Sequence, residues 1–191
     1  MNQRNLNEVD WSKIPAPVDD GATAHLVGMT IPPISLRATD DTMVTLSTLP
    51  GRIVVFAYPR TGEPGKIALV DDWDMIPGAR GCTPQTCAFR DLFADLKAAG
   101  ASHVFGLSTQ DNVYQTEMAS RLHLPFPVLS DEKLELARAL RLPTMDVAGL
   151  TLIKRLTLVV DDGRITHVFY PVFPPDQNAS EVLAWLKENP V

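Results

Sequence analysis

Residues 53–58 read Ile-Val-Val-Phe-Ala-Tyr, an uninterrupted apolar run that is β-branched at its start. Such a run predicts a strand that is buried on both faces, as in the interior of an α/β sheet. Downstream, Phe89, Leu92, Phe93 and Leu96 have the spacing of one apolar helix face, and Gly100 is well placed to end that helix. The long segment 59–81 between them is rich in glycine and proline, so we expect a strand–loop–helix unit.

Further strands and helices are predicted on both sides of this unit. Strands are expected at 43–46, 103–108, 126–129, 155–160 and 165–170, and helices at 111–122, after the capping residue Asp131, and at 178–188. Asp162-Gly163 between the last two strands is a hairpin signal. Strands alternating with helices predict an α/β fold in which a mixed central sheet is flanked by helices on both faces.

Length and composition favour one globular domain. The chain has 191 residues, of which 45% are hydrophobic, and residues 1–24 are polar and aperiodic, so we expect an N-terminal arm followed by a domain over 25–191. The formal net charge of −6 argues against nucleic-acid partners and against an anionic membrane surface. Residues 1–8 show no apolar secretory signal, so the expected compartment is the cytoplasm.

Two cysteines are the chemically distinctive residues of the chain. Cys82 follows the long loop and stands at the predicted helix start, where the helix dipole and nearby Arg80 and Arg90 would stabilise a thiolate. This position indicates a nucleophilic cysteine, and the alternative is a buried structural cysteine. Two cysteines alone exclude a disulfide-stapled scaffold.

Cys87 lies five residues further along and suggests a partner for an oxidised Cys82. Five helical residues rise about 7.5 Å and turn about 140°, so the two Cα atoms would lie beyond the reach of a disulfide unless the helix unwinds. Pro84 between them is tolerated only near a helix start, which makes this opening turn the expected moving part. The spacing fits neither a zinc site nor a two-residue dithiol motif well.

The segment 81–91, Gly-Cys-Thr-Pro-Gln-Thr-Cys-Ala-Phe-Arg-Asp, resembles the peroxidatic segment of peroxiredoxins, and is closest to their Q-type subclass, also called bacterioferritin comigratory protein. Three more segments, 46–51, 53–59 and 154–163, are similar to other parts of that family, and the resemblance extends over about 26–188. It implies a thioredoxin-like fold and a thiol-dependent peroxidase.

The resemblance also implies roles for individual residues. Cys82 would be the peroxidatic cysteine, Cys87 the resolving cysteine of an intramolecular disulfide, and Arg155 the residue that holds the thiolate and the peroxide oxygen. The implied partners are a hydrogen peroxide or organic hydroperoxide substrate and a thioredoxin- or glutaredoxin-type reductant. No metal or organic cofactor is expected, and the protein would be a monomer or homodimer. Two alternatives are a thiol–disulfide oxidoreductase and a non-catalytic binding protein, both with a thioredoxin fold.

The chain departs from the family in its active-site loop. Ala79 stands where the family has a threonine or serine, and an insertion at about 60–81 separates Pro59 from Cys82. We therefore predict that the insertion bulges outward and returns, which would place Thr61 next to Cys82 to supply the missing hydroxyl. The apolar residues of its tip, Val70, Trp73, Met75 and Ile76, would cover the pocket or a partner surface, and the alternative is a docked loop with no functional role.

Overall fold

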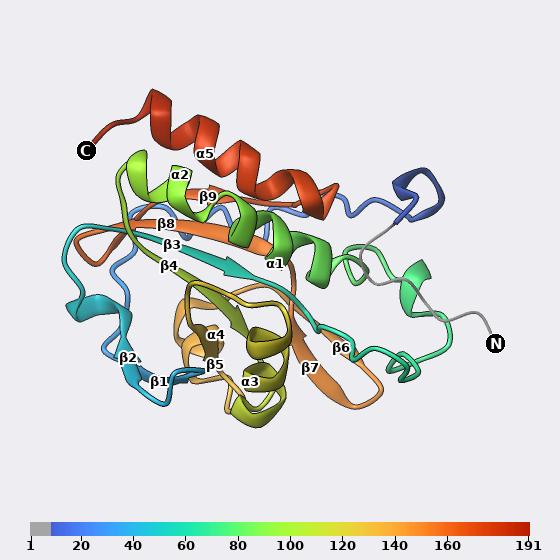
Figure 1. The fold of residues 1–191 in the computed structure, drawn as a ribbon. Coiled ribbons are helices and arrows are strands. Elements are labelled where there is room, and N and C mark those ends of the chain that lie inside the picture. The colour runs from blue at the N-terminus through green and yellow to red at the C-terminus, as the bar shows by residue number, and fades with distance from the viewer. Residues whose placement is uncertain (1–8) are drawn as a thin grey trace.

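A seven-stranded sheet forms the centre of residues 9–191, the part of the chain that the computed structural model describes (Figure 1). Its strands are β1 (Ser35–Ala38), β2 (Met43–Thr45), β3 (Arg52–Ala57), β4 (Ala101–Ser108), β5 (Val128–Ser130), β8 (Leu156–Asp161) and β9 (Arg164–Phe169). They lie in the order β2-β1-β5-β4-β3-β8-β9. Strand β4 runs parallel to β3 and β5, whereas β3 pairs antiparallel with β8, so the predicted mixed sheet is confirmed.

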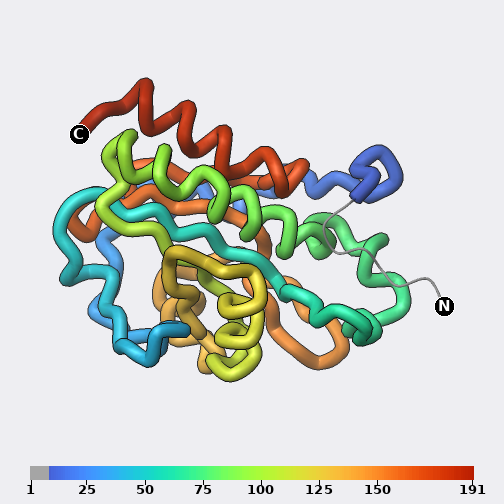
Figure 2. Tube along the Cα trace, in the orientation of Figure 1, coloured from blue at the N-terminus to red at the C-terminus, as the bar shows by residue number. Residues whose placement is uncertain are grey.

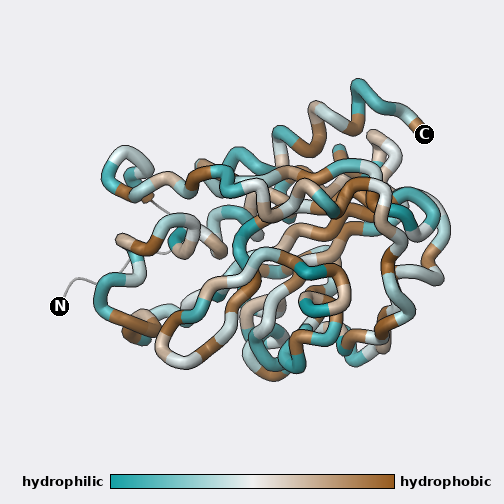
Figure 3. Tube along the Cα trace, turned by 180° about the vertical axis from the view of Figure 1, so that it is seen from behind, coloured by the Kyte–Doolittle hydropathy of each residue, from teal (hydrophilic) through white to brown (hydrophobic). Residues whose placement is uncertain are grey.

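Strand β3 separates two hydrophobic cores because its side chains alternate between the faces of the sheet. Ile53, Val55 and Ala57 belong to one core, and Val54 and Phe56 belong to the other, together with Tyr58 directly after the strand. All of these side chains are buried. The hydropathy-coloured tube accordingly shows hydrophobic segments through the middle of the molecule (Figure 3).

Helices cover both faces of the sheet, as predicted. The helices are α1 (Cys82–Asp91), α2 (Phe93–Ala98), α3 (Asn112–Arg121), α4 (Glu135–Leu140) and α5 (Asn178–Glu188). Side chains of α1, α2, α3 and α5 enter the core that contains Phe56, and side chains of α4 enter the opposite core. None of the helices in the described part of the chain is long and apolar enough to cross a membrane.

The predicted hairpin is confirmed, and aspartates lie at the starts of two predicted helices, although α4 begins only after Leu134. Asp111 caps α3 by accepting a hydrogen bond from the Tyr114 backbone, and Asp131 accepts from the first backbone N–H groups of α4. Asp162 and Gly163 turn β8 into β9 with positive φ angles of 45° and 79°. These aspartate hydrogen bonds and this turn each involve residues close together in sequence, so the sequence alone could indicate them.

The structure differs from the sequence-based prediction at three places. The helix that carries the apolar stripe is not continuous, because it breaks at Leu92 into α1 and α2. Strand β1 and the separate hairpin of β6 (Thr144–Val147) and β7 (Leu150–Ile153) were not predicted. Each of these strands has only four residues, and although β1 alternates between exposed and buried side chains, so short a run does not stand out in the sequence.

The β6–β7 hairpin supports the 60–81 segment. Trp73 and Ala79 of that segment form a third hydrophobic cluster with Val147 and Leu152 of the hairpin. A short 3-10 turn at Trp73–Met75 lies within this packed stretch, whereas Met75 itself is exposed. The segment is therefore anchored to the hairpin by long-range packing and not only held by its two ends.

Residues 9–24 of the N-terminal arm run close to the same end of the molecule (Figure 2). The Trp11 indole N–H donates to the Asp176 carboxylate over 2.9 Å, and its ring packs edge-on against Phe173. The remainder of the predicted arm, residues 1–8, lies outside the described residues. This end of the molecule also carries the cysteine at the start of α1.

Candidate active site

Cys82 is the first residue of α1, and its side chain is only 3% exposed. Gly81 precedes it with a φ of 103°, a left-handed conformation that favours glycine. A Cβ atom at Gly81 would also lie 2.6 Å from the Trp11 ring and 2.8 Å from Pro175 Cγ. Glycine therefore lets the loop pass beneath the N-terminal arm and deliver Cys82 to the positive end of the helix dipole.

Arg155 approaches the sulfur from the other side of the site. It lies directly before β8, the antiparallel neighbour of β3, and its Nη2 is 3.2 Å from Cys82 Sγ. The same Nη2 lies 3.1–3.2 Å from the carbonyl oxygens of Gly78, Ala79 and Arg80. A buried guanidinium in this position stabilises negative charge on sulfur, and the predicted proximity of Arg155 and Cys82 is confirmed.

A buried amide network orients Arg155 through α1. Arg155 Nη1 donates to Gln85 Oε1 over 2.5 Å, and Gln85 Nε2 donates to Asn178 Oδ1 over 2.9 Å. The Thr157 hydroxyl donates to the same Asn178 oxygen over 2.7 Å. Gln85, which lies between the two cysteines in the sequence, thus connects the first turn of α1 both to Arg155 and to α5.

Thr61 lies in the same site, but its hydroxyl points to another partner. Thr61 Oγ1 donates to Gln110 Oε1 over 3.1 Å, and the Thr61 backbone N–H donates to the same oxygen over 2.9 Å. The Tyr114 hydroxyl in turn donates to the Thr61 carbonyl oxygen over 2.9 Å. The insertion does return to bring Thr61 and Cys82 into one cavity, yet the hydroxyl hydrogen is given to Gln110 and not to sulfur.

Cys87 is half-buried on α1, and both cysteines are free thiols. Burial raises the pKa of the Cys87 thiol above its ordinary value, although Arg90 nearby acts in the opposite direction. Arg90 does not reach Cys82 as the sequence suggested, because its guanidinium bonds to the Leu122 carbonyl and the Asp91 carboxylate. Arg80 lies in the cavity, with its Nε 3.8 Å from Asp74 Oδ1.

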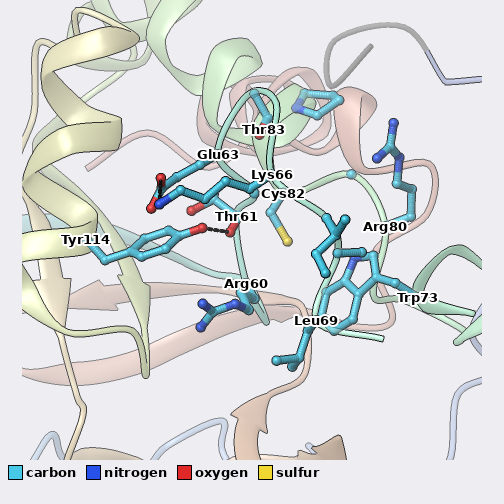
Figure 4. A pocket seen from close by; sticks show the side chains of 15 residues that line it. Arg60, Thr61, Glu63, Lys66, Leu69, Trp73, Arg80, Cys82, Thr83 and Tyr114 are labelled. Atoms are coloured by element: carbon cyan, nitrogen blue, oxygen red, sulfur yellow. Dashed lines mark hydrogen bonds and ion pairs between the residues drawn. The ribbon is translucent and has the colours of Figure 1, made fainter. Parts of the chain in front are cut away.

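A cavity of about 480 Å³ opens above Cys82. Figure 4 shows the sulfur between two walls: Tyr114, Thr61, Glu63 and Lys66 on one side, and Leu69 and Trp73 on the other. Most of the lining residues come from the 60–81 insertion and from the loop end that leads into α1. A ligand in this cavity would therefore meet the sulfur, two guanidinium-bearing arginines and an apolar wall.

Several residues of the site were missed by the sequence analysis. Gln85 stands inside the cysteine motif but gave no chemical signal, and Asn178 appeared only as the start of the last predicted helix. Gln110, Tyr114 and Thr157 are brought to the site only by the tertiary fold, since they lie far from Cys82 in sequence. The one sequence signal for Gln110 is its place among polar residues just after the carboxyl end of β4, a buried strand.

Comparison with known sequences adds to this geometry. The model of the Redoxin family matches residues 26–184. A chloroplastic peroxiredoxin Q from Oryza sativa subsp. japonica is 34% identical over 162 residues, which cover 84% of this chain and 66% of the rice sequence. The corresponding protein from Sedum lineare is 33% identical over 84% of this chain and 77% of its own length. The chain thus spans slightly less than two thirds of the rice relative.

Solved structures show the same likeness. The crystal structure of peroxidoxin BcpB from Mycobacterium tuberculosis matches with a TM-score of 0.68 and 28% identity, over 86% of this chain and 98% of that one. A Xanthomonas campestris peroxiredoxin Q structure matches with a TM-score of 0.65 and 21% identity, over 92% of this chain and 98% of that one, and shows a shared fold. With its thioredoxin-like fold, the chain belongs to the Q-type peroxiredoxins, a family of thiol-dependent peroxidases.

Proposed function

We propose that this protein reduces hydroperoxides with Cys82 as its nucleophile. The observation that carries the proposal is the 3.2 Å contact of Arg155 Nη2 with the sulfur of Cys82, a residue that lines an open cavity. A guanidinium donor beside the sulfur can stabilise the thiolate, and then the charge that develops on the departing oxygen. A cysteine that served only as a structural hydrophobe would need neither the cation nor the cavity.

The first step oxidises sulfur by two electrons. The Cys82 thiolate attacks the terminal peroxide oxygen, an S–O bond forms and the O–O bond breaks. The leaving alkoxide or hydroxide takes a proton and departs as alcohol or water, while Cys82 becomes a sulfenic acid. Arg155 is the residue placed to stabilise that leaving oxygen, because its guanidinium is buried and fixed by Gln85.

The second step would form the Cys82–Cys87 disulfide. The Cys87 thiol gives up its proton and attacks the sulfenic sulfur, an S–S bond forms and the S–O bond breaks, and the departing hydroxide takes up a proton to leave as water. Because both cysteines lie within α1, this step requires the helix to unwind and the bonds of Gln85 to be broken. An external dithiol of the thioredoxin or glutaredoxin type would then reduce the disulfide by exchange.

A coupled assay tests the proposed function. Wild-type protein with hydrogen peroxide and a thioredoxin reducing system should turn over, and Cys82→Ser should not. Cys87→Ser should consume about one equivalent of peroxide and then stop with thioredoxin, because its sulfenic acid has no resolving partner. Substantial peroxide consumption by Cys82→Ser would refute the assignment, and protein-disulfide reduction without peroxide consumption would favour a thiol–disulfide oxidoreductase.

Compartment and assembly belong to the same proposal. Turnover needs a compartment that supplies reduced dithiols, and the cytoplasm is such a compartment; the plant relatives are named as chloroplastic proteins. We also propose that the protein is a monomer or homodimer. Subcellular fractionation and sedimentation of the reduced and oxidised protein would test these two points.

A further inference from the structure

Gln85 is the residue of α1 whose side chain has to move when the two cysteines meet. It lies between Cys82 and Cys87, and its side chain is fully buried. Both ends of its amide are bonded, the oxygen to Arg155 and the nitrogen to Asn178. When the first turns of a helix unwind, water can take over the backbone hydrogen bonds. The two buried side-chain bonds of Gln85 are lost in the same event.

Asn178 holds Gln85 from outside the helix. It is the first residue of α5, which lies alongside α1 and α2 (Figure 1), and it is fully buried. Its Oδ1 accepts the bond from Gln85 at 2.9 Å and the bond from the Thr157 hydroxyl at 2.7 Å. Because Thr157 lies on β8 two residues after Arg155, these bonds form a circuit from Arg155 through Gln85 and Asn178 to β8. The first turn of α1 is therefore fastened to both α5 and β8.

The nitrogen of the Asn178 amide contributes nothing to this circuit. Nδ2 is buried and has no hydrogen-bond partner among residues 9–191. A buried donor without a partner lowers the stability of a fold, so stability alone does not account for an asparagine at this position. What Asn178 supplies is one oxygen atom, which is placed to accept from Gln85 and Thr157 together.

Two reactions compete for the sulfenic acid of Cys82, and the state of α1 decides between them. If α1 unwinds, Cys87 reaches the sulfur and the disulfide forms with release of water. If α1 stays folded, the oxidised sulfur remains beside Arg155 and attacks a second hydroperoxide. A second S–O bond then forms, the O–O bond breaks, and the departing oxygen takes up a proton and leaves as alcohol or water. The sulfur is oxidised by two more electrons to a sulfinic acid.

We propose that Asn178 is a positioning residue that sets the balance between these two reactions. Its bond to Gln85 keeps α1 folded and Arg155 in place, which favours attack on peroxide and delays the disulfide. When this bond breaks, Gln85 leaves its site, α1 unwinds and Arg155 loses one of its acceptors. Asn178 acts through Gln85 and does not line the described cavity. The inference rests on the proposed function and concerns the timing of its second step.

Single-turnover measurements on two substitutions of Asn178 test the proposal. After one equivalent of hydrogen peroxide, samples are quenched with dimedone and a thiol-alkylating reagent, and the mass of the tryptic peptide 81–90 gives the rate of disulfide formation. Asn178→Ala should form the disulfide about 3–10-fold faster than wild type, the effect of losing about one hydrogen bond. In excess peroxide it should yield correspondingly less sulfinic acid. Asn178→Asp keeps an oxygen that accepts both bonds, so it should form the disulfide no faster than wild type.

A further control separates the Gln85–Asn178 bond from overall stability. Leu36→Ala removes buried volume from the core on the opposite face of the sheet, so it lowers the free energy of unfolding without touching α1. This variant should keep the wild-type rate of disulfide formation. If Asn178→Ala does not fold, Thr157→Val takes its place, because it keeps the shape of the side chain and removes one of the two donors that hold Asn178 Oδ1. It should also accelerate the disulfide.

The proposal is overturned if Asn178→Ala, or Thr157→Val in its place, forms the disulfide at or below the wild-type rate. Equal acceleration by Asn178→Asp or by Leu36→Ala would overturn it as well. The proposed function fails separately, if wild type consumes no peroxide or if Cys82→Ser consumes it. If wild type turns over through the Cys82–Cys87 disulfide and Asn178→Ala does not accelerate this step, only the role of Asn178 is wrong.

Discussion

At the scale of single residues, the site depends on one buried arginine that touches the sulfur. Replacing Arg155 by methionine keeps much of the side-chain volume but removes the donor to Cys82. Removal of one preorganised donor lowers such rates by about 100–1000-fold, so Arg155→Met should slow the reaction with peroxide to this extent. Arg155→Lys keeps the positive charge but loses the planar set of guanidinium N–H donors, so its rate should lie between those of the wild type and Arg155→Met. Stopped-flow rates within twofold of wild type would leave Arg155 only a structural role.

The hydroxyl of Thr61, which the sequence predicted to serve Cys82, has another hydrogen-bond partner in the structure. This hydroxyl donates to Gln110 in the described structure, and a hydroxyl group can rotate towards another acceptor. We predict that Thr61→Val slows peroxide reduction by about 10–1000-fold, because one oriented donor near the sulfur is lost. Thr61→Ser, which keeps the hydroxyl, serves as the control. If Thr61→Val reacts at the normal rate, Thr61 only anchors the loop through Gln110.

At the scale of elements, α1 has to hold Cys87 until Cys82 is oxidised. Burial raises the pKa of Cys87, and only the thiolate reacts with alkylating reagents. In Cys82→Ser, where Cys87 is the only thiol, iodoacetamide should therefore react slowly at neutral pH. The rate should rise with pH through a midpoint above about 8.5, the ordinary value for cysteine. Free cysteine is the control, and a midpoint at or below its own would contradict the folded environment of Cys87.

The elements that depend on local sequence signals were the ones that the sequence could predict. The apolar run 53–58 and the Asp and Gly signals act locally, so β3, the role of Asp131 at the start of α4 and the β8–β9 turn were foreseen. The position of Trp73 was not, because it depends on packing against Val147 and Leu152 more than seventy residues away. The Gln85–Asn178 contact was invisible for the same reason, and a buried amide pair leaves no periodic pattern.

At the scale of the whole molecule, a half-buried ion pair joins β3 and β8 at the strand ends away from the site. Arg52 of β3 binds Asp161 of β8 with Nε–Oδ1 at 2.7 Å and Nη2–Oδ2 at 3.0 Å. Asp161→Asn would leave the buried guanidinium without a charged partner, which should lower the free energy of unfolding by about 2–3 kcal/mol. Asp41→Asn, which breaks an exposed pair with Arg37, should change it by less than about 1 kcal/mol.

The pH dependence of this pair has a definite sign. The hydrogen bond from Arg52 lowers the pKa of Asp161 below its ordinary value. The stabilisation is therefore present above the ordinary aspartate pKa of about 3.9 and is lost as the pH falls through the lowered value. Urea unfolding should show the wild type losing its advantage over Asp161→Asn in acid. A difference that stays constant down to pH 2, roughly the lower end for such carboxylates, would contradict this account.

The central claim is that peroxide oxidises Cys82 and that Cys87 then closes an intramolecular disulfide. Trypsin should release residues 81–90, which contain both cysteines, as one peptide, because Arg80 and Arg90 flank it. The direct measurement is the mass of this peptide after one equivalent of hydrogen peroxide and quenching of free thiols. The account predicts a peptide lighter by two hydrogens and not alkylated, whereas Cys82→Ser keeps an alkylatable Cys87. Two alkylated thiols after the peroxide has been consumed, or the peptide found only in disulfides between chains, would contradict it.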